Sequence, residues 1–117
     1  MLSRSLFTFP CKVAAQTLTQ LFALCGRQME QESSFPEVVG VLLVKTGDTN
    51  KFLRIAASDA LDTMVENVSI NTATTVLVSG GLGSRNVMIR VCVAFLLLHI
   101  VRQAEIFRGE QSNFLDI

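Results

Sequence analysis

The stretch NKFLRIAASDALDTMV (residues 50–65) decides the fold, because a similar stretch, NVMIRVCVAFLLLHIV, follows at residues 86–101. From residue 50 to residue 86 the offset is 36 positions, and it matches Asn50 with Asn86 and Arg54 with Arg90. The apolar positions coincide too, with Ala57, Ala60, Leu61 and Met64 matching Val93, Leu96, Leu97 and Ile100. Apolar residues three and four apart mark one face of an α-helix, so both stretches are predicted to be helices of a repeated unit.

Each unit is predicted to hold a short apolar helix, a turn with glycine, and a longer helix with an arginine in its first turn. Helices are predicted at residues 11–30, 35–44, 51–67, 71–78 and 86–104. A period of about 35–45 residues with two helices per unit is typical of HEAT or armadillo solenoids. The fold is therefore predicted to be all-α, an α-solenoid of HEAT-type antiparallel helix pairs with about two and a half repeats. Residues 1–10 form a non-repeat segment, 11–104 a partial repeat domain and 105–117 a tail.

Three structural roles are predicted for residues in and beside the turns of the repeat. Gly47 is expected to take the left-handed conformation that ends a helix, and Thr49 or Asn50 to cap the next helix. Arg54 and Arg90 are expected to have an inter-repeat structural role, each reaching an acid or a carbonyl in the adjacent unit.

Two apolar runs are expected to be buried helices. The run at 38–44 is apolar nearly all round and should be covered on more than one side. The run at 91–101 is closed by Arg90 and Arg102, well short of the roughly 20 residues that a bilayer span needs. No membrane partner is predicted.

The composition favours helices with apolar surface that packs against another protein. Of the 117 residues 50% are hydrophobic and 17% charged, with neither Trp nor Tyr. Charged residues are usually about a quarter of a soluble chain, so some apolar surface is expected to meet another protein. Ten basic and ten acidic residues give a formal charge of zero, which disfavours nucleic acid as a partner.

The sequence offers no set of residues for catalysis, and no enzyme activity, metal or cofactor is predicted. Cys11, Cys25 and Cys92 are far apart and form no CxxC pair, so reduced thiols are expected. His99 lies in an apolar run and is interpreted as a core or rim residue. The loop at 80–85 lacks the Gly-Lys-Ser/Thr ending of a phosphate-binding loop, and Asp59, Asp62 and Glu66 form a solvated helix face.

The N-terminal segment leaves an alternative open. No acidic residue precedes Glu30, whereas Arg4, Lys12 and several hydroxyl residues are present. Mitochondrial transit peptides share that composition. A mitochondrially targeted helical protein is therefore a second alternative.

The segment LVKTGDTNKFLRIAASDALDTMV (residues 43–65) resembles the TOG-domain subfamily of HEAT repeats, in particular the TOG array regulators of axonemal microtubules, the crescerin family. The Gly-Asp-Thr-Asn turn at 47–50, Phe52, Arg54 and Ala-Leu-Asp at 60–62 carry this resemblance, which extends over about residues 12–103. A TOG domain has six such repeats, and fewer than half are present here.

The resemblance implies a module that binds αβ-tubulin or microtubules along the edge formed by the turns inside each helix pair, in the cytoplasm, at the cytoskeleton or cilium. Carried onto this chain, those turns are residues 45–51 and 79–86. The polar groups able to meet tubulin's acidic surface are then Lys45, Asn50, Lys51, Arg85 and Asn86. The main alternative is a generic HEAT-repeat scaffold whose partner is another protein or its own parent repeats.

Overall fold

The computed structural model describes the backbone of residues 2–115 and the side chains of residues 11–106. Within this range the chain is all-α, which confirms the predicted fold class. The helices are α1 (Leu2–Met29), α2 (Phe35–Lys45), α3 (Lys51–Asn67), α4 (Ile70–Gly81) and α5 (Val87–Leu115).

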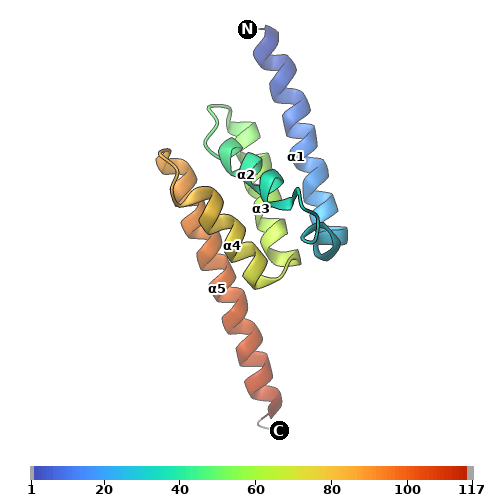
Figure 1. Ribbon diagram of the computed structural model, residues 1–117, viewed down its shortest axis with the longest axis vertical. Coiled ribbons are helices and arrows are strands. Elements are labelled where there is room, and N and C mark those ends of the chain that lie inside the picture. Colours follow the sequence, from blue (N-terminus) through green and yellow to red (C-terminus); the bar gives the residue numbers. More distant parts are fainter. Residues whose placement is uncertain (1, 116–117) are drawn as a thin grey trace.

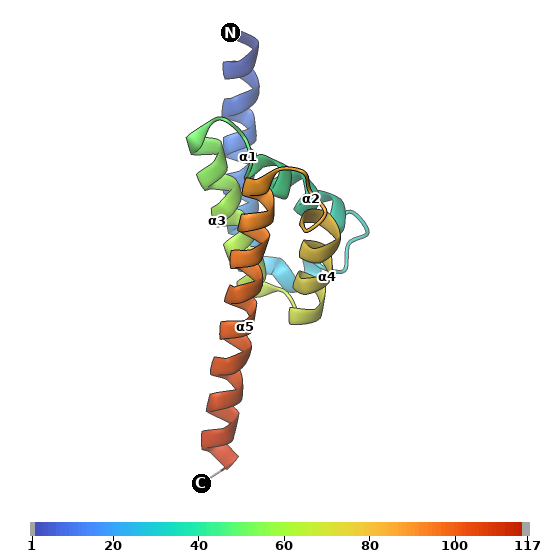
Figure 2. The ribbon, with the colours of Figure 1, turned by 90° about the vertical axis from the view of Figure 1, so that its left-hand side faces the viewer.

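The helices form two layers. Helices α1, α3 and α5 lie side by side and run in the same direction, while α2 and α4 cover them from one side (Figures 1 and 2). Each short helix pairs with the long helix that follows it, so α2–α3 and α4–α5 are two successive units stacked on the single helix α1. The molecule is elongated, 62 × 29 × 25 Å. This arrangement is a solenoid-like stack of helix pairs.

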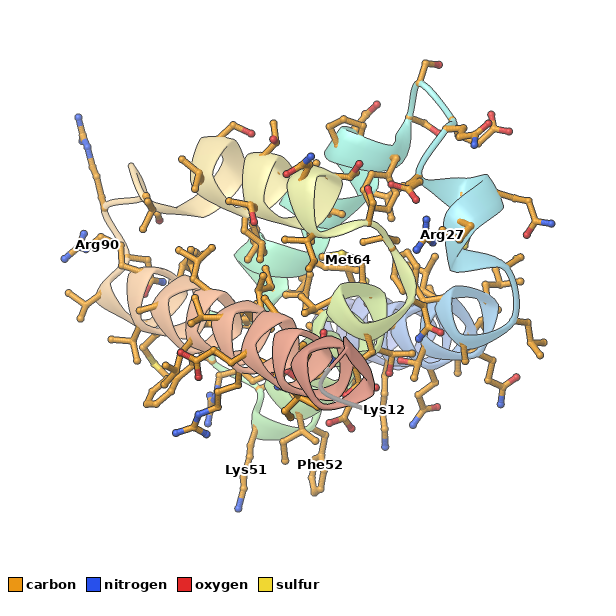
Figure 3. All side chains as sticks on the ribbon, turned by 90° about the horizontal axis from the view of Figure 1, so that it is seen from below. Lys12, Arg27, Lys51, Phe52, Met64 and Arg90 are labelled. Atoms are coloured by element: carbon orange, nitrogen blue, oxygen red, sulfur yellow. The ribbon has the colours of Figure 1, made fainter. Side chains whose placement is uncertain are left out.

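The core lies between the two layers. The predicted inner face of α3 is buried throughout, and Met64 lies at the centre of the bundle (Figure 3). Phe22 of α1 meets Phe35 of α2 edge to face, with 6.3 Å between ring centroids, which ties the single helix to the first unit. Gly81 is buried where α4 crosses α5, and a Cβ there would collide with Val93.

The two outer helices are longer than predicted. Helix α1 begins at Leu2 and passes through Pro10, and α5 continues to Leu115, where the sequence had indicated limits of 11 and 104. Hydrophobic periodicity detects only the part of a helix that packs against a neighbour, so it misses turns that project beyond the bundle. The division into 1–10, 11–104 and 105–117 stays a prediction.

The apolar run of α5, expected to be a buried helix, is buried on one face only. Ile89, Val93, Leu96 and Ile100 point into the core, whereas Phe95 is 67% exposed. The window Val87–Ile106 is long and apolar enough to cross a membrane, with a mean hydropathy of 1.8, and 22% of it is buried. The limits predicted at Arg90 and Arg102 are therefore too narrow, because both arginines lie inside this window. Mostly buried core helices pass the same test, so one such helix does not by itself indicate a membrane span.

Helix α2 also differs from the prediction. Val39, Leu42 and Leu43 are buried, but Val41 and Val44 are 54% and 61% exposed. Helix α2 is therefore covered on one side only, because a stack of two units leaves the outer surface of the short-helix layer open.

Candidate functional site

The turn between α2 and α3 is closed by three side chains. Asp48 accepts a hydrogen bond from the backbone N–H of Asn50 at 2.8 Å through Oδ1. Asn50 is the N-cap of α3, and its Oδ1 accepts from the N–H of Leu53 at 3.1 Å. Nη1 of Arg54 donates to the carbonyl oxygens of Asp48 and Thr49 at 2.9 and 3.1 Å. This turn is thus held by side chains of its own unit.

The turn between α4 and α5 makes similar bonds, and two of them, those corresponding to Asp48–Asn50 and Arg54–Asp48, repeat at the offset of 36 residues. Oγ of Ser84 accepts from the N–H of Asn86 at 3.1 Å, and Oδ1 of Asn86 accepts from the N–H of Met88 at 2.9 Å. Nη1 of Arg90 donates to the carbonyl oxygen of Ser84 at 2.6 Å. The repeat seen in the sequence is therefore a repeat of turn hydrogen bonds as well as of apolar positions.

These contacts differ from the role expected of the two arginines. Arg54 and Arg90 hydrogen-bond to carbonyls of their own turns, not to groups of an adjacent unit. Each guanidinium reaches back six residues, because the turn folds over the first turn of the helix that follows. The arginines therefore stabilise turns within units.

The two turns lie next to each other at one end of the bundle (Figure 1). A Cβ built on Gly47 would be 2.5 Å from Nδ2 of Asn86 and 3.1 Å from Cγ1 of Ile89. Gly47 does not have the left-handed conformation expected of it, since the chain has no positive-φ glycine in its described part. Glycine is needed at position 47 because the neighbouring turn is so close. We call this end of the bundle, formed by residues 45–51 and 82–86, the turn edge.

The predicted site residues divide into two kinds on the turn edge. Lys51 and Arg85 are exposed, and Lys51 points away from the bundle in Figure 3. Asn50 and Asn86 have their side-chain oxygens engaged as helix caps. Lys45 is half-buried and lines a groove between α1 and α2. The structure brings all five to one edge, and two of them present exposed cations there.

Two neighbouring residues were not among the site residues predicted from the sequence. Nζ of Lys12, in α1, lies 5.2 Å from the ring centroid of Phe52, and Phe52 is 63% exposed. Lys12, Lys51 and Phe52 project from the same side of the molecule (Figure 3). The sequence pattern of α1 and that of α3 do not indicate this contact, because it depends on how the two helices pack against each other.

The opposite end of the bundle is held by Glu30. Its carboxylate accepts from the N–H of Ser69 at 3.2 Å and from Oγ of Ser69 at 2.7 Å, and so joins the α1–α2 turn to the start of α4. The hydrogen bonds from Ser69 and Thr72 lower the pKa of Glu30. Glu30 therefore stabilises the fold at this end of the bundle.

Titratable groups also lie between α3 and α5. Nε2 of His99 is 3.3 Å from Oε1 of Glu66, and His99 is partly exposed, as expected of a rim histidine. Burial raises the pKa of Asp62 and of the Cys92 thiol. The described residues contain no cluster of three or more His, Cys, Asp or Glu side chains that could hold a metal ion. The expectation that the chain is not an enzyme stays a prediction.

The fold and its turns define a class, a stack of HEAT-type helix pairs with one edge built of turns. The chain is similar to TOG array regulator of axonemal microtubules protein 1 of Mus musculus, with 34% identity over 90 residues. Those residues are 77% of this chain and 5% of the relative, so the chain spans a small part of that protein's length. No protein-family model and no solved structure matches the chain. The similarity supports a relationship to the TOG array regulators.

Proposed function

We propose that this chain is a non-enzymatic, TOG-type module that binds αβ-tubulin or microtubules through the turn edge. The observation that carries the proposal is the position of Lys51 and Arg85, exposed on two adjacent turns of one edge. The similarity to a regulator of axonemal microtubules supports the choice of partner.

The geometry gives this edge a fixed arrangement of charge. Gly47 lies close to Asn86, so the two turns are adjacent, and the caps of α3 and α5 fix where each helix begins. Two cations held on one edge attract an acidic protein surface and orient it during encounter. Binding of this kind weakens as salt rises.

The test is co-migration of the purified chain with unpolymerised αβ-tubulin on size exclusion, at low and at moderate salt. We expect a salt-sensitive complex that is lost in the double variant Lys51→Glu/Arg85→Glu. Arg102→Glu is the matched control, because Arg102 is an exposed arginine of α5 about three turns beyond Arg90. Its charge reversal should leave the complex intact.

Other outcomes would reject the proposal. If circular dichroism shows that the chain is folded and no complex forms, the generic HEAT-repeat scaffold becomes the favoured function. Its partner would then be another protein or the parent repeats. Equal loss with Arg102→Glu would show that net charge, not the turn edge, controls binding.

The proposal extends to location and to the particular relative. We place the protein at the cytoskeleton of the cilium, as a chain related to the second vertebrate member of the TOG array regulators. A fluorescent fusion in ciliated cells should label axonemes with or without residues 1–10. Mitochondrial labelling that depends on residues 1–10 would favour the targeted helical protein instead.

A further inference from the structure

The outer surface of the long-helix layer carries exposed apolar side chains from two helices. Phe52 and Ile55 of α3 are 63% and 48% exposed, and Met88, Val91 and Phe95 of α5 are 54%, 47% and 67% exposed. We call these five residues the α3–α5 face. Monomeric proteins rarely expose contiguous apolar patches of this kind without a binding role.

The α3–α5 face has a ridge with a groove on each side. One groove, of about 430 Å³, runs between α3 and α5 and is lined by Ile55, Met88, Val91 and Phe95. The other runs between α1 and α3 and is lined by Lys12, Phe52 and again Ile55. Because Ile55 borders both grooves, the exposed stripe of α3 is a ridge that another helix surface can meet by ridge-into-groove packing.

Charge changes sign along this ridge. Lys51 and Arg54 lie at its start, whereas Asp59, Asp62 and Glu66 follow further along α3. At 1.5 Å per residue, Lys51 and Asp62 are about 16 Å apart along the helix axis. A surface that is basic at one end, apolar in the middle and acidic at the other is complementary to itself when one copy is reversed.

We propose that the α3–α5 face is the interface of a homodimer, in which α3 of one copy packs antiparallel to α3 of a second copy. In this register Lys51 faces Asp62 of the second copy, since their residue numbers sum to 113 and the two positions lie on the same side of α3. A two-fold axis makes this pair occur twice, as an isologous interface requires.

The expected dimer is weak. Helix α3 has 17 residues and is about 25 Å long, and two helices about 8–10 Å apart and about 10 Å in diameter give a strip about 20 Å wide. The α3–α5 face then covers about 500 Å² per copy, at the lower limit for a specific interface. Burial already raises the pKa of Asp62, so a cation from the second copy would stabilise its carboxylate.

The experiment is sedimentation velocity of the full chain from low to high micromolar concentration. We expect a monomer–dimer equilibrium that Lys51→Glu or Asp62→Lys alone weakens by about tenfold or more. Mixing the two variants should restore dimers, because the glutamate introduced in one chain then meets the lysine introduced in the other, and the second pair stays native. Recovery on mixing cannot come from a general effect on folding.

An apolar variant with a matched control completes the test. Phe95→Ser should weaken the dimer about tenfold or more, whereas Val44→Ser should not, since Val44 is similarly exposed but lies in the short-helix layer. A monomer at all concentrations would overturn the proposal. So would a dimer indifferent to Phe95→Ser, equal weakening by Val44→Ser, or no recovery when the charge variants are mixed. The assay contains no tubulin, so its outcome is independent of the proposed function.

Discussion

Gly47 of the α2–α3 turn lies against the side chain of Asn86 of the α4–α5 turn, so closely that a Cβ on Gly47 would be 2.5 Å from Nδ2 of Asn86. The two units therefore approach each other closely at the residue that caps α5. This close approach also explains the glycine without an unusual backbone conformation.

Gly47→Ala should lower the free energy of unfolding by about 1–3 kcal/mol, because the methyl group must displace the Asn86 cap or Ile89. Gly83→Ala is the control, since a Cβ there meets nothing within 4 Å. Removal of backbone freedom should make that variant neutral or slightly more stable. Urea denaturation measures both, and equal effects of the two substitutions would contradict the contact.

Arg90→Met should destabilise the chain by about 1 kcal/mol, because it keeps the aliphatic stem and removes the hydrogen bond to the Ser84 carbonyl. Arg54→Met should behave alike, because Arg54 makes the equivalent bond in its own turn. Arg102→Met, at an exposed site on α5, should change the free energy of unfolding by less than about 0.5 kcal/mol. If all three variants unfold at the same urea concentration as the parent chain, the arginines do not stabilise the turns.

Stability should fall in acid through Glu30. Its folded-state pKa is lowered by Ser69 and Thr72, so the carboxylate stabilises the fold above its ordinary value near 4.5. That contribution is lost as pH falls through the lowered pKa. Glu30→Gln should therefore reduce the urea midpoint at pH 7, and the gap from the parent chain should narrow at low pH.

Glu32→Gln serves as the control for this pH dependence, because Glu32 is an exposed carboxylate in the same turn. Its urea midpoint should stay close to that of the parent chain at every pH from 7 down to 3. A constant gap between parent and Glu30→Gln over that range would show that the Glu30 charge does not contribute.

Thermal unfolding of the isolated chain should be broad and should begin below the range of about 45–65 °C usual for small domains. Two helix pairs and one helix are fewer than the roughly three repeats that a stable solenoid needs. Circular dichroism at 222 nm measures the transition. A sharp transition at high temperature would mean that the exposed apolar surface is covered, and repeating the measurement with Phe95→Ser would show whether the α3–α5 face is responsible.

The inner surfaces of the repeat could be predicted from the sequence because burial leaves a period. The face of α3 that contains Ala57, Leu61 and Met64 is buried as predicted, since apolar residues three and four apart must share one side of a helix. Residue preference also pointed to Asn50 as one of two possible caps. Local chemistry was sufficient for these features.

The remaining features depend on contacts between segments distant in sequence. The pairing of Lys12 with Phe52 and the proximity of Gly47 to Asn86 arise only after the helices pack. The roles of Arg54 and Arg90 were misassigned because a long side chain can reach either its own turn or a neighbour, and residue type does not distinguish them. Apolar content likewise overestimated the burial of α2 and α5, since it cannot show whether a covering helix is present.

The turn bonds made by Arg54 and Arg90 have a consequence for how such chains can grow. Each arginine closes a turn of its own unit, and each asparagine caps its own helix, so a segment of one repeat length brings with it every polar contact that its turn needs. A gene duplication that copies one segment in register therefore adds a unit whose turn needs no polar group from its neighbours. The apolar surfaces between units must remain compatible, as must the contacts of Glu30 with Ser69 and of Glu66 with His99. Apolar exchanges that conserve side-chain volume are tolerated best at such surfaces. The length of the array can therefore change in single steps, whereas the local structure of each turn stays constant.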